Sequence, residues 1–186
     1  GTKRALLVGI NYDGTERELI GAHKAVWKVH QYLQDAHNFK EVNITTLLDN
    51  ALTSEEPTRE NIVRYLVRLA RETKVGDLAL VHFVGHGEQH ATDPLMLTSS
   101  RDIAKCLMVP SDYKTGRLVT EHTVRESFLL AIPSGAYVTF LLDSCHESSA
   151  NLLDMPYEYF SKADPQGDNS KAAKSSSQSS LVDNGR

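Results

Sequence analysis

Two side chains that could carry out nucleophilic catalysis lie far apart in the sequence. Cys145 occurs in the segment FLLDSCHESS, and His86 lies between two glycines, 59 positions earlier. A cysteine attacks a carbonyl as its thiolate, and a histidine can take up the thiol proton and later protonate a leaving amine. The amides of Gly87 and Cys145 would then face the developing oxyanion. The pair predicts acyl-transfer chemistry if the fold brings both residues to one cleft.

Structural roles and a metal site are alternatives for these residues. A single cysteine at the end of a strand is commonly a small buried apolar residue. His82, His86 and His90 recur at every fourth position, as metal ligands on a helix do, but they begin inside an expected strand and span two glycines. His146 is a second candidate base, yet adjacent side chains at the end of a strand point to opposite faces, which favours His86.

The other cysteine and the remaining regular pattern carry weaker signals. Cys106 lies in a weakly patterned segment with no evident partner. His23, His30 and His37 are spaced by seven on the edge of an expected helix, which favours a solvated face. The sequence contains no phosphate-binding glycine loop, dinucleotide fingerprint or paired-cysteine zinc motif.

The elements that must position these residues alternate along the chain. Apolar and β-branched runs predict four strands, and residues recurring every three or four positions predict three helices between them. The expected strands cover residues 3–10, 42–48, 78–85 and 136–143, and the expected helices cover 19–33, the segment after Thr58 that carries Ile62, Leu66 and Leu69, and 121–132. This order predicts a mostly parallel sheet covered on both faces, with His86 and Cys145 at its carboxyl edge.

Composition places the chain among ordinary soluble domains. Its 186 residues are 40% hydrophobic and 24% charged, with a net charge of -4 and no basic stripe, which argues against a nucleic-acid surface. No apolar run approaches the roughly 20 residues of a membrane span, and two cysteines are too few for a disulfide framework. We expect one domain over residues 1–160, a flexible linker over 161–186, and a location in the cytoplasm or nucleus.

Six segments add a resemblance to a known family. They are KRALLVGINY, GAHKAV, PTRENIVRYL, GDLALVHFVGHGEQ, FLLDSCHESS and DMPYEY, and in this order they resemble the metacaspases, caspase-like cysteine peptidases, over Lys3 to Phe160. The resemblance implies a caspase-like three-layer α/β/α sandwich with a mostly parallel sheet. It also implies that Cys145 is the nucleophile, that His86 is its base and that Asp143 lines the pocket for a basic substrate side chain.

The resemblance further implies an endopeptidase that cleaves after Arg or Lys, is activated by calcium and matures by cleavage of a linker between two subunits. The chain is similar to the large subunit plus linker, and the caspase fold has six strands where four are expected here. The expected partners are therefore protein or peptide substrates and the missing small-subunit region, with no nucleic acid and no membrane. We expect the protein to be a monomer.

Several positions depart from the family pattern in the resembling segments. Ala25 stands where a second pocket acid is usual, and Val84 stands where a pocket serine is usual. One carboxylate holds a guanidinium less well than two, since each charge-assisted hydrogen bond contributes roughly 1.5 to 3 kcal/mol. Glu147 replaces a serine and brings a negative charge next to the nucleophile, which is expected to raise the thiol pKa.

The acids that would bind calcium are also fewer than the ion prefers. Ca²⁺ takes roughly 6 to 8 oxygen ligands. The matching positions here retain Glu121 with Thr120, and Asp154, while Ala104 replaces a further acid and Asp102 lies nearby. We expect no cofactor to be required for the chemistry and calcium activation to be weak or absent. The competing function is a catalytically weak caspase-like module that acts in interaction or regulation.

Overall fold

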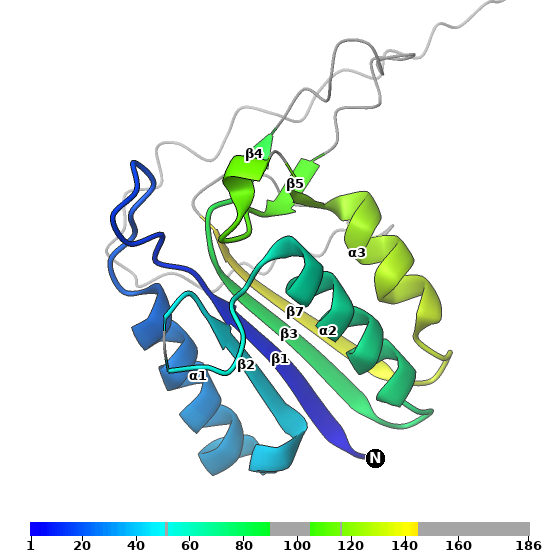
Figure 1. The fold of residues 1–186 in the computed structure, drawn as a ribbon. Coiled ribbons are helices and arrows are strands. Elements are labelled where there is room, and N and C mark those ends of the chain that lie inside the picture. The colour runs from blue at the N-terminus through cyan, green and yellow to red at the C-terminus, as the bar shows by residue number, and fades with distance from the viewer. Residues whose placement is uncertain (51, 90–104, 116, 145–186) are drawn as a thin grey trace, which may run out of the picture. The chain divides into compact units, whose positions relative to one another are not determined.

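A four-stranded parallel sheet with the strand order β2-β1-β3-β7 forms the centre of the protein (Figure 1). The computed structural model describes residues 1–50, 52–89, 105–115 and 117–144, all within one compact unit, Gly1–Asp154. The strands are β1 (Lys3–Gly9), β2 (Ile44–Leu48), β3 (Leu78–Gly85) and β7 (Tyr137–Ser144). The four predicted strands and their parallel arrangement are thereby confirmed. The linker expected over 161–186 lies outside the described residues.

Helices cover both faces of this sheet, as the alternation of elements predicts. The helices are α1 (Ala22–His37), α2 (Arg59–Glu72) and α3 (Glu121–Ser127), with short 3-10 turns η1 (Glu41–Asn43), η2 (Tyr113–Thr115) and η3 (Leu129–Ala131). One core cluster packs α2 and α3 against one face, and a second packs α1 against the other. The three-layer α/β/α arrangement is therefore confirmed.

The position of β3 in the sheet explains its burial, and local residues explain where α2 and α1 begin. Strand β3 is buried along nearly its whole length because it has neighbours on both sides and helices on both faces. Helix α2 begins where the Thr58 side chain accepts a hydrogen bond from the Asn61 backbone N–H at 3.3 Å, so the predicted N-cap is confirmed. Helix α1 starts after Gly21, whose φ of 106° is a conformation that favours glycine.

Several predicted boundaries are wrong. The helix expected over residues 19–33 is α1, which begins at Ala22 and ends at His37. The helix expected over residues 121–132 ends at Ser127, because Phe128 leaves helical dihedrals and its fully buried ring packs edge-on against Phe140 at 5.5 Å. The strand expected from Val42 begins at Ile44, after the turn η1. At Phe128, tertiary packing overrides a local pattern that is correct for most of the element, whereas Val42 is exposed and belongs to the turn before the strand.

A second, antiparallel sheet has no counterpart in the sequence-based expectations. It joins β4 (Glu88–Gln89), β5 (Lys105–Met108) and β6 (Val119–Thr120) in the order β4-β5-β6. These strands have two to four residues each, too few for alternation of apolar and polar residues to be recognised. The small sheet matters because β4 follows the His86 segment directly.

Strand β7 is only half covered by the described elements. Val138, Phe140 and Leu142 pack on the core beneath α2 and α3, whereas the alternate residues are exposed. Among those exposed side chains are Tyr137, at 68%, and Leu141, at 46%.

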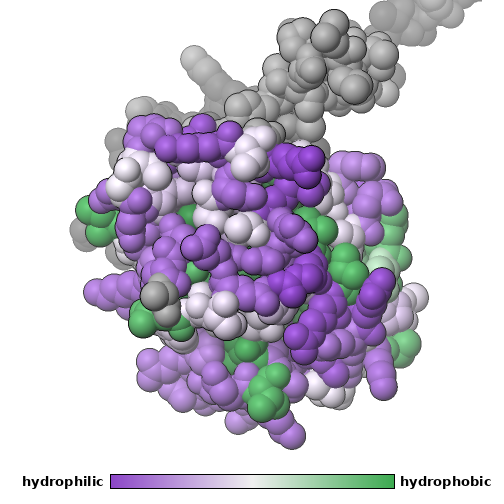
Figure 2. Space-filling model, in the orientation of Figure 1, coloured by the Kyte–Doolittle hydropathy of each residue, from purple (hydrophilic) through white to green (hydrophobic). Residues whose placement is uncertain are grey.

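On the face that Figure 2 shows, hydrophilic residues predominate and apolar residues form small separate patches. No helix of the described residues is long and apolar enough to cross a membrane.

Candidate active site

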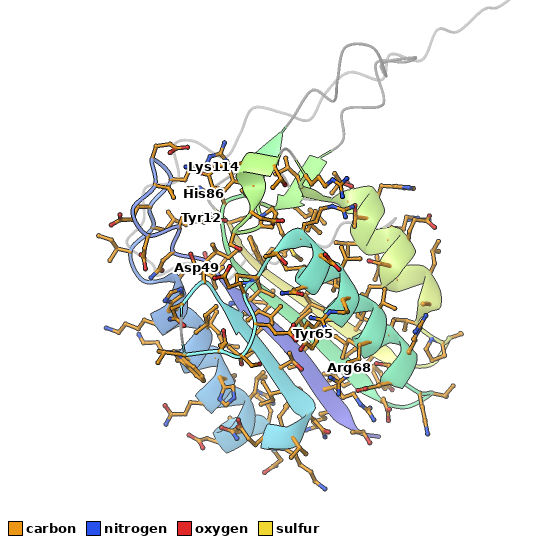
Figure 3. All side chains as sticks on the ribbon, in the orientation of Figure 1. Tyr12, Asp49, Tyr65, Arg68, His86 and Lys114 are labelled. Atoms are coloured by element: carbon orange, nitrogen blue, oxygen red, sulfur yellow. The ribbon has the colours of Figure 1, made fainter. Side chains whose placement is uncertain are left out.

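His86 lies at the carboxyl edge of the parallel sheet, one residue beyond the end of β3. Its backbone N–H donates to the Tyr12 hydroxyl at 3.1 Å, and its carbonyl accepts from the Val109 N–H at 2.9 Å. Its imidazole Nε2 lies 2.8 Å from the Arg17 carbonyl oxygen. The loop after β1, through Tyr12 and Arg17, and the segment at Val109 therefore hold the backbone and the ring of this histidine; Figure 3 shows Tyr12 beside His86.

The contact with Arg17 determines which nitrogen of the neutral His86 ring carries the proton. A carbonyl oxygen can only accept a hydrogen bond, so Nε2 must carry the proton. In a neutral imidazole the other nitrogen, Nδ1, is then an acceptor. His86 is therefore prepared to take a proton at Nδ1 while Nε2 remains bonded to the protein.

Tyr12 lies against this histidine in the loop after β1. Its ring centroid is 5.0 Å from that of His86, with an angle of 43° between the planes. Its backbone has a φ of 54°, a left-handed conformation that is uncommon for a bulky residue. The Asp49 carboxylate accepts hydrogen bonds from the N–H groups of Asn11 and Tyr12, at 2.9 and 2.7 Å, which stabilises this conformation.

Asp49 also anchors a polar cluster at the start of α1. The His23 Nε2 lies 2.5 Å from an Asp49 oxygen, and the Asn11 and Asn50 side-chain amides lie 3.2 and 3.0 Å from the His23 Nδ1. The Asn11 side-chain oxygen accepts from the Ala22 N–H at 3.0 Å and so caps α1. The cluster ties the ends of β1 and β2 to the first turn of that helix.

The solvated face expected for His23, His30 and His37 is therefore wrong for two of the three. His23 belongs to the Asp49 cluster, and His30 is only 8% exposed and contacts Glu41 at 3.3 Å. His37 is exposed as expected. The heptad spacing identified a common helix edge but could not show which acids the neighbouring segments bring to it.

The expected pocket residues fall on one face of the sheet. Val84 on β3 and Asp143 on β7 are register partners, and Ala25 on α1 packs against the cluster that contains Val84. Asp143 is exposed, whereas Val84 is 8% exposed. The structure thus brings the three positions to the α1 side of the sheet, where one carboxylate stands among apolar neighbours.

His82 lies on the same face of β3, next to Leu141 in the register. It is 2% exposed, and its Nδ1 has no hydrogen-bond partner among the described residues. Burial lowers the pKa of His82, and the negative charge of Asp143 opposes that shift. His82 therefore favours its neutral form in the folded protein.

Other predicted site residues are only partly within the described part of the chain. Gly87 is buried and follows His86 directly, and Glu121 is the first residue of α3. The predicted nucleophile Cys145 lies outside the described residues. The same holds for His90, Asp102, Ala104, His146, Glu147 and Asp154. Among residues 1–50, 52–89, 105–115 and 117–144, no three His, Cys, Asp or Glu side chains form a group that could hold a metal ion.

The chain matches the family described as Metacaspase, peptidase C14 domain, over residues 3–156. The chain belongs to the metacaspase family. This membership agrees with the segments that suggested it and with the observed α/β sheet flanked by helices, which is caspase-like. A crystal structure of protein GSU0716 from Geobacter sulfurreducens shares the fold, with a TM-score of 0.59, 17% identity, and coverage of 81% of this chain and 53% of that one.

Named metacaspases from several kingdoms are similar in sequence. Metacaspase-1 of Lodderomyces elongisporus is 34% identical over 87% of this chain and 36% of its own length, and metacaspase-4 of Arabidopsis thaliana is 36% identical over 82% and 35%. A Trypanosoma brucei brucei protein named inactive metacaspase-4 is 30% identical over 94% and 48%. The chain thus spans about a third to a half of these relatives, and membership alone does not decide activity.

Sequence reasoning found His86 but missed Tyr12 and Asp49. Both follow the carboxyl ends of predicted strands, which is the signal that could have identified them. Arg17 acts through its carbonyl, so its residue type carried no information about this contact.

Proposed function

We propose that this metacaspase domain is part of a cysteine endopeptidase in which Cys145 attacks the peptide carbonyl and His86 transfers the proton. The supporting observation is the common end of β3 and β7. Gly85 pairs with Ser144 in the parallel register, and these two residues are followed in the sequence by His86 and Cys145. The Arg17 carbonyl keeps the proton on Nε2 and leaves Nδ1 to accept the thiol proton.

The Gly87 amide is suited to stabilise the oxyanion in this mechanism. In a trans peptide the carbonyl and the following N–H point in opposite directions. Since the His86 carbonyl accepts from Val109, the N–H of Gly87 points away from Val109. We assign the second donor to the amide of Cys145. Removal of one such donor typically costs about 3 kcal/mol of transition-state stabilisation.

We propose that the substrate residue before the cleaved bond is Arg or Lys, with Asp143 as its counter-charge. The exposed carboxylate of Asp143 and its position two residues before Cys145 support this assignment. Ala25 and Val84 offer no second charge, so the pocket holds the stem of the basic side chain mainly by apolar contact. Discrimination between basic and uncharged residues is accordingly weaker than in a pocket with two carboxylates.

The expected small-subunit region has more support from the described residues than the expected calcium ion has. The exposed alternate side chains of β7 and its position at the edge of the sheet support further strands from a small-subunit region beside it. Calcium has weaker support, because the matching positions hold few acids: Glu121 with Thr120, and Asp154, while Ala104 replaces a further acid. We propose that catalysis needs no cofactor, that calcium activates weakly or not at all, and that the assembled protein is a monomer.

The second candidate function is a regulatory or interaction module without strong catalysis. A relative named inactive metacaspase is 30% identical to this chain, and Ala25 and Val84 remove polar groups from the expected pocket. In that case the domain would bind peptides or partner proteins without hydrolysing them.

Fluorogenic peptides with Arg, Lys or Asp before the cleaved bond separate the two functions. They would be incubated with this chain and with a longer form that includes the small-subunit region, with and without calcium, beside Cys145→Ala. The peptidase predicts cleavage after Arg or Lys that the alanine variant lacks. Cleavage that survives in Cys145→Ala, or no cleavage in either form, would contradict it.

A further inference from the structure

The Tyr12 hydroxyl bonds to two segments of the chain, at His86 and at Val109. It donates to the Val109 carbonyl at 2.6 Å and accepts from the His86 N–H at 3.1 Å. The Val109 N–H donates in turn to the His86 carbonyl. Both backbone polar groups of His86 are therefore fixed by one closed set of three hydrogen bonds, in which the hydroxyl is the only side-chain member.

The space around this hydroxyl is closely filled. Tyr12 is 3% exposed. A Cβ atom added at Gly85 would lie 2.9 Å from the Tyr12 oxygen and 2.6 Å from the Phe83 Cζ, closer than real Cβ contacts. The glycine before His86 thus allows the phenol to approach the backbone, and a small displacement of the hydroxyl is transmitted to the histidine.

The Asp49 carboxylate holds the left-handed backbone of Tyr12 in place. Asp49 accepts from the N–H groups of Asn11 and Tyr12, and the loop that follows carries the Arg17 carbonyl to the His86 Nε2. The same loop therefore holds His86 twice, through the phenol on its backbone and through a carbonyl on its ring. Figure 3 shows Tyr12 and His86 near one another at this edge, with Asp49 below them.

We propose that Tyr12 is a positioning residue for His86: its hydroxyl fixes the histidine backbone so that the ring meets the Arg17 carbonyl and presents Nδ1 to the nucleophile. The catalytic consequence rests on the proposed peptidase function. The effect on the ring does not, because it concerns the orientation and tautomer of His86 in the folded chain.

The test uses Tyr12→Phe, which retains the buried ring and removes the hydroxyl. Tyr65→Phe is the matched control, since Tyr65 lies on α2 and is partly buried against the same core. The first readout is the ¹⁵N NMR signal of the His86 ring, assigned by its loss in His86→Gln. We expect the Nε2-protonated tautomer in the original chain and in Tyr65→Phe, and a mixture of tautomers in Tyr12→Phe.

The second readout is peptide hydrolysis by the longer form that includes the small-subunit region. Misplacement of a catalytic group by about 1 Å can cost about 100-fold, so we expect Tyr12→Phe to lower kcat about 10- to 100-fold with little change in KM. A variant that merely lost stability would lower the folded fraction and leave the tautomer and the pH profile of the folded molecules unchanged.

The possible results separate the two proposals. If the original protein cleaves no peptide, the proposed function fails while the NMR signal still tests Tyr12. Unchanged His86 signals in Tyr12→Phe would overturn the positioning role, whatever the activity. Should Tyr12→Phe not fold, Asp49→Asn weakens the support of the Tyr12 backbone instead, and the same mixture of tautomers is expected; an unchanged His86 signal there would overturn the proposal.

Discussion

Two aspartates at opposite edges of the sheet make similar bonds with different consequences. Asp77, at the amino end of β3, accepts from the N–H groups of Thr2 and Lys74, at 2.6 and 3.1 Å, and from the Arg4 guanidinium at 2.8 Å. Asp49, at the carboxyl end of β2, accepts from the N–H groups of two consecutive residues in the loop after β1.

The two aspartates differ in the residues whose backbone N–H groups they accept from. Asp77 joins the beginnings of β1 and β3, where the residues it bonds make no described contact with the candidate active site. Asp49 supports Tyr12, which contacts His86 directly. Under the proposed function, the carboxylate of Asp77 contributes only to stability, whereas that of Asp49 contributes to stability and to the geometry of His86, at the edge where sites of parallel sheets lie.

The largest effect should come from Asp49→Ala. It leaves the Asn11 and Tyr12 N–H groups without their acceptor and removes the partner of His23, so the loop that carries Tyr12 and Arg17 loosens. We expect kcat per folded molecule to fall about 10- to 100-fold, measured by peptide hydrolysis after the folded fraction is quantified by circular dichroism. An unchanged kcat per folded molecule would contradict the proposed difference between Asp49 and Asp77.

Asp77→Ala should lower the stability of the protein without changing its activity. Hydrogen bonds from the Thr2 and Lys74 backbones, with the Arg4 guanidinium, hold the pKa of Asp77 below its ordinary value of 3.8. Its contribution to stability is thus complete above that value and is lost as the pH falls through the lower folded pKa. We expect a lower urea midpoint at pH 7 and unchanged kcat per folded molecule; a loss of kcat comparable to that of Asp49→Ala would contradict the comparison.

His82→Leu should change how stability depends on pH near neutrality. Because burial lowers the pKa of His82 in the folded state, the unfolded chain binds more protons as the pH falls below the ordinary value of 6.5. Stability should therefore decrease from pH 6.5 downward in the original protein and decrease less steeply in the variant. Urea denaturation at several pH values between 5 and 8 checks this, and identical slopes would be the contrary outcome.

Thr58→Ala should have the smallest effect, because it removes a single hydrogen bond at a helix cap. The Thr58 side chain accepts one backbone N–H at the start of α2. Loss of such a cap costs about 1 kcal/mol. The expected decrease in unfolding free energy can be measured by urea denaturation, with kcat unchanged; a change in kcat would indicate that α2 also positions the site.

The sequence predicts the elements that position the site better than the contacts within it. Apolar and β-branched runs located the four parallel strands, and the strand ends located His86. The resemblance to the metacaspases, and not the strand pattern, pointed to the register partners Val84 and Asp143. Tyr12 and Asp49 were missed because their roles depend on a left-handed backbone and on hydrogen bonds between segments distant in the chain. No local pattern specifies such bonds. The three strands of the second sheet were missed for another reason, because two to four residues are too few to show alternation.

The most direct measurement is hydrolysis of an Arg-containing peptide by the longer form, compared with Cys145→Ala and His86→Ala. The account predicts cleavage after Arg that both variants lose, because the thiol and the histidine act as one unit. Retained cleavage in either variant, or none in the original protein, would contradict the assignment of His86 and Cys145 as the catalytic pair.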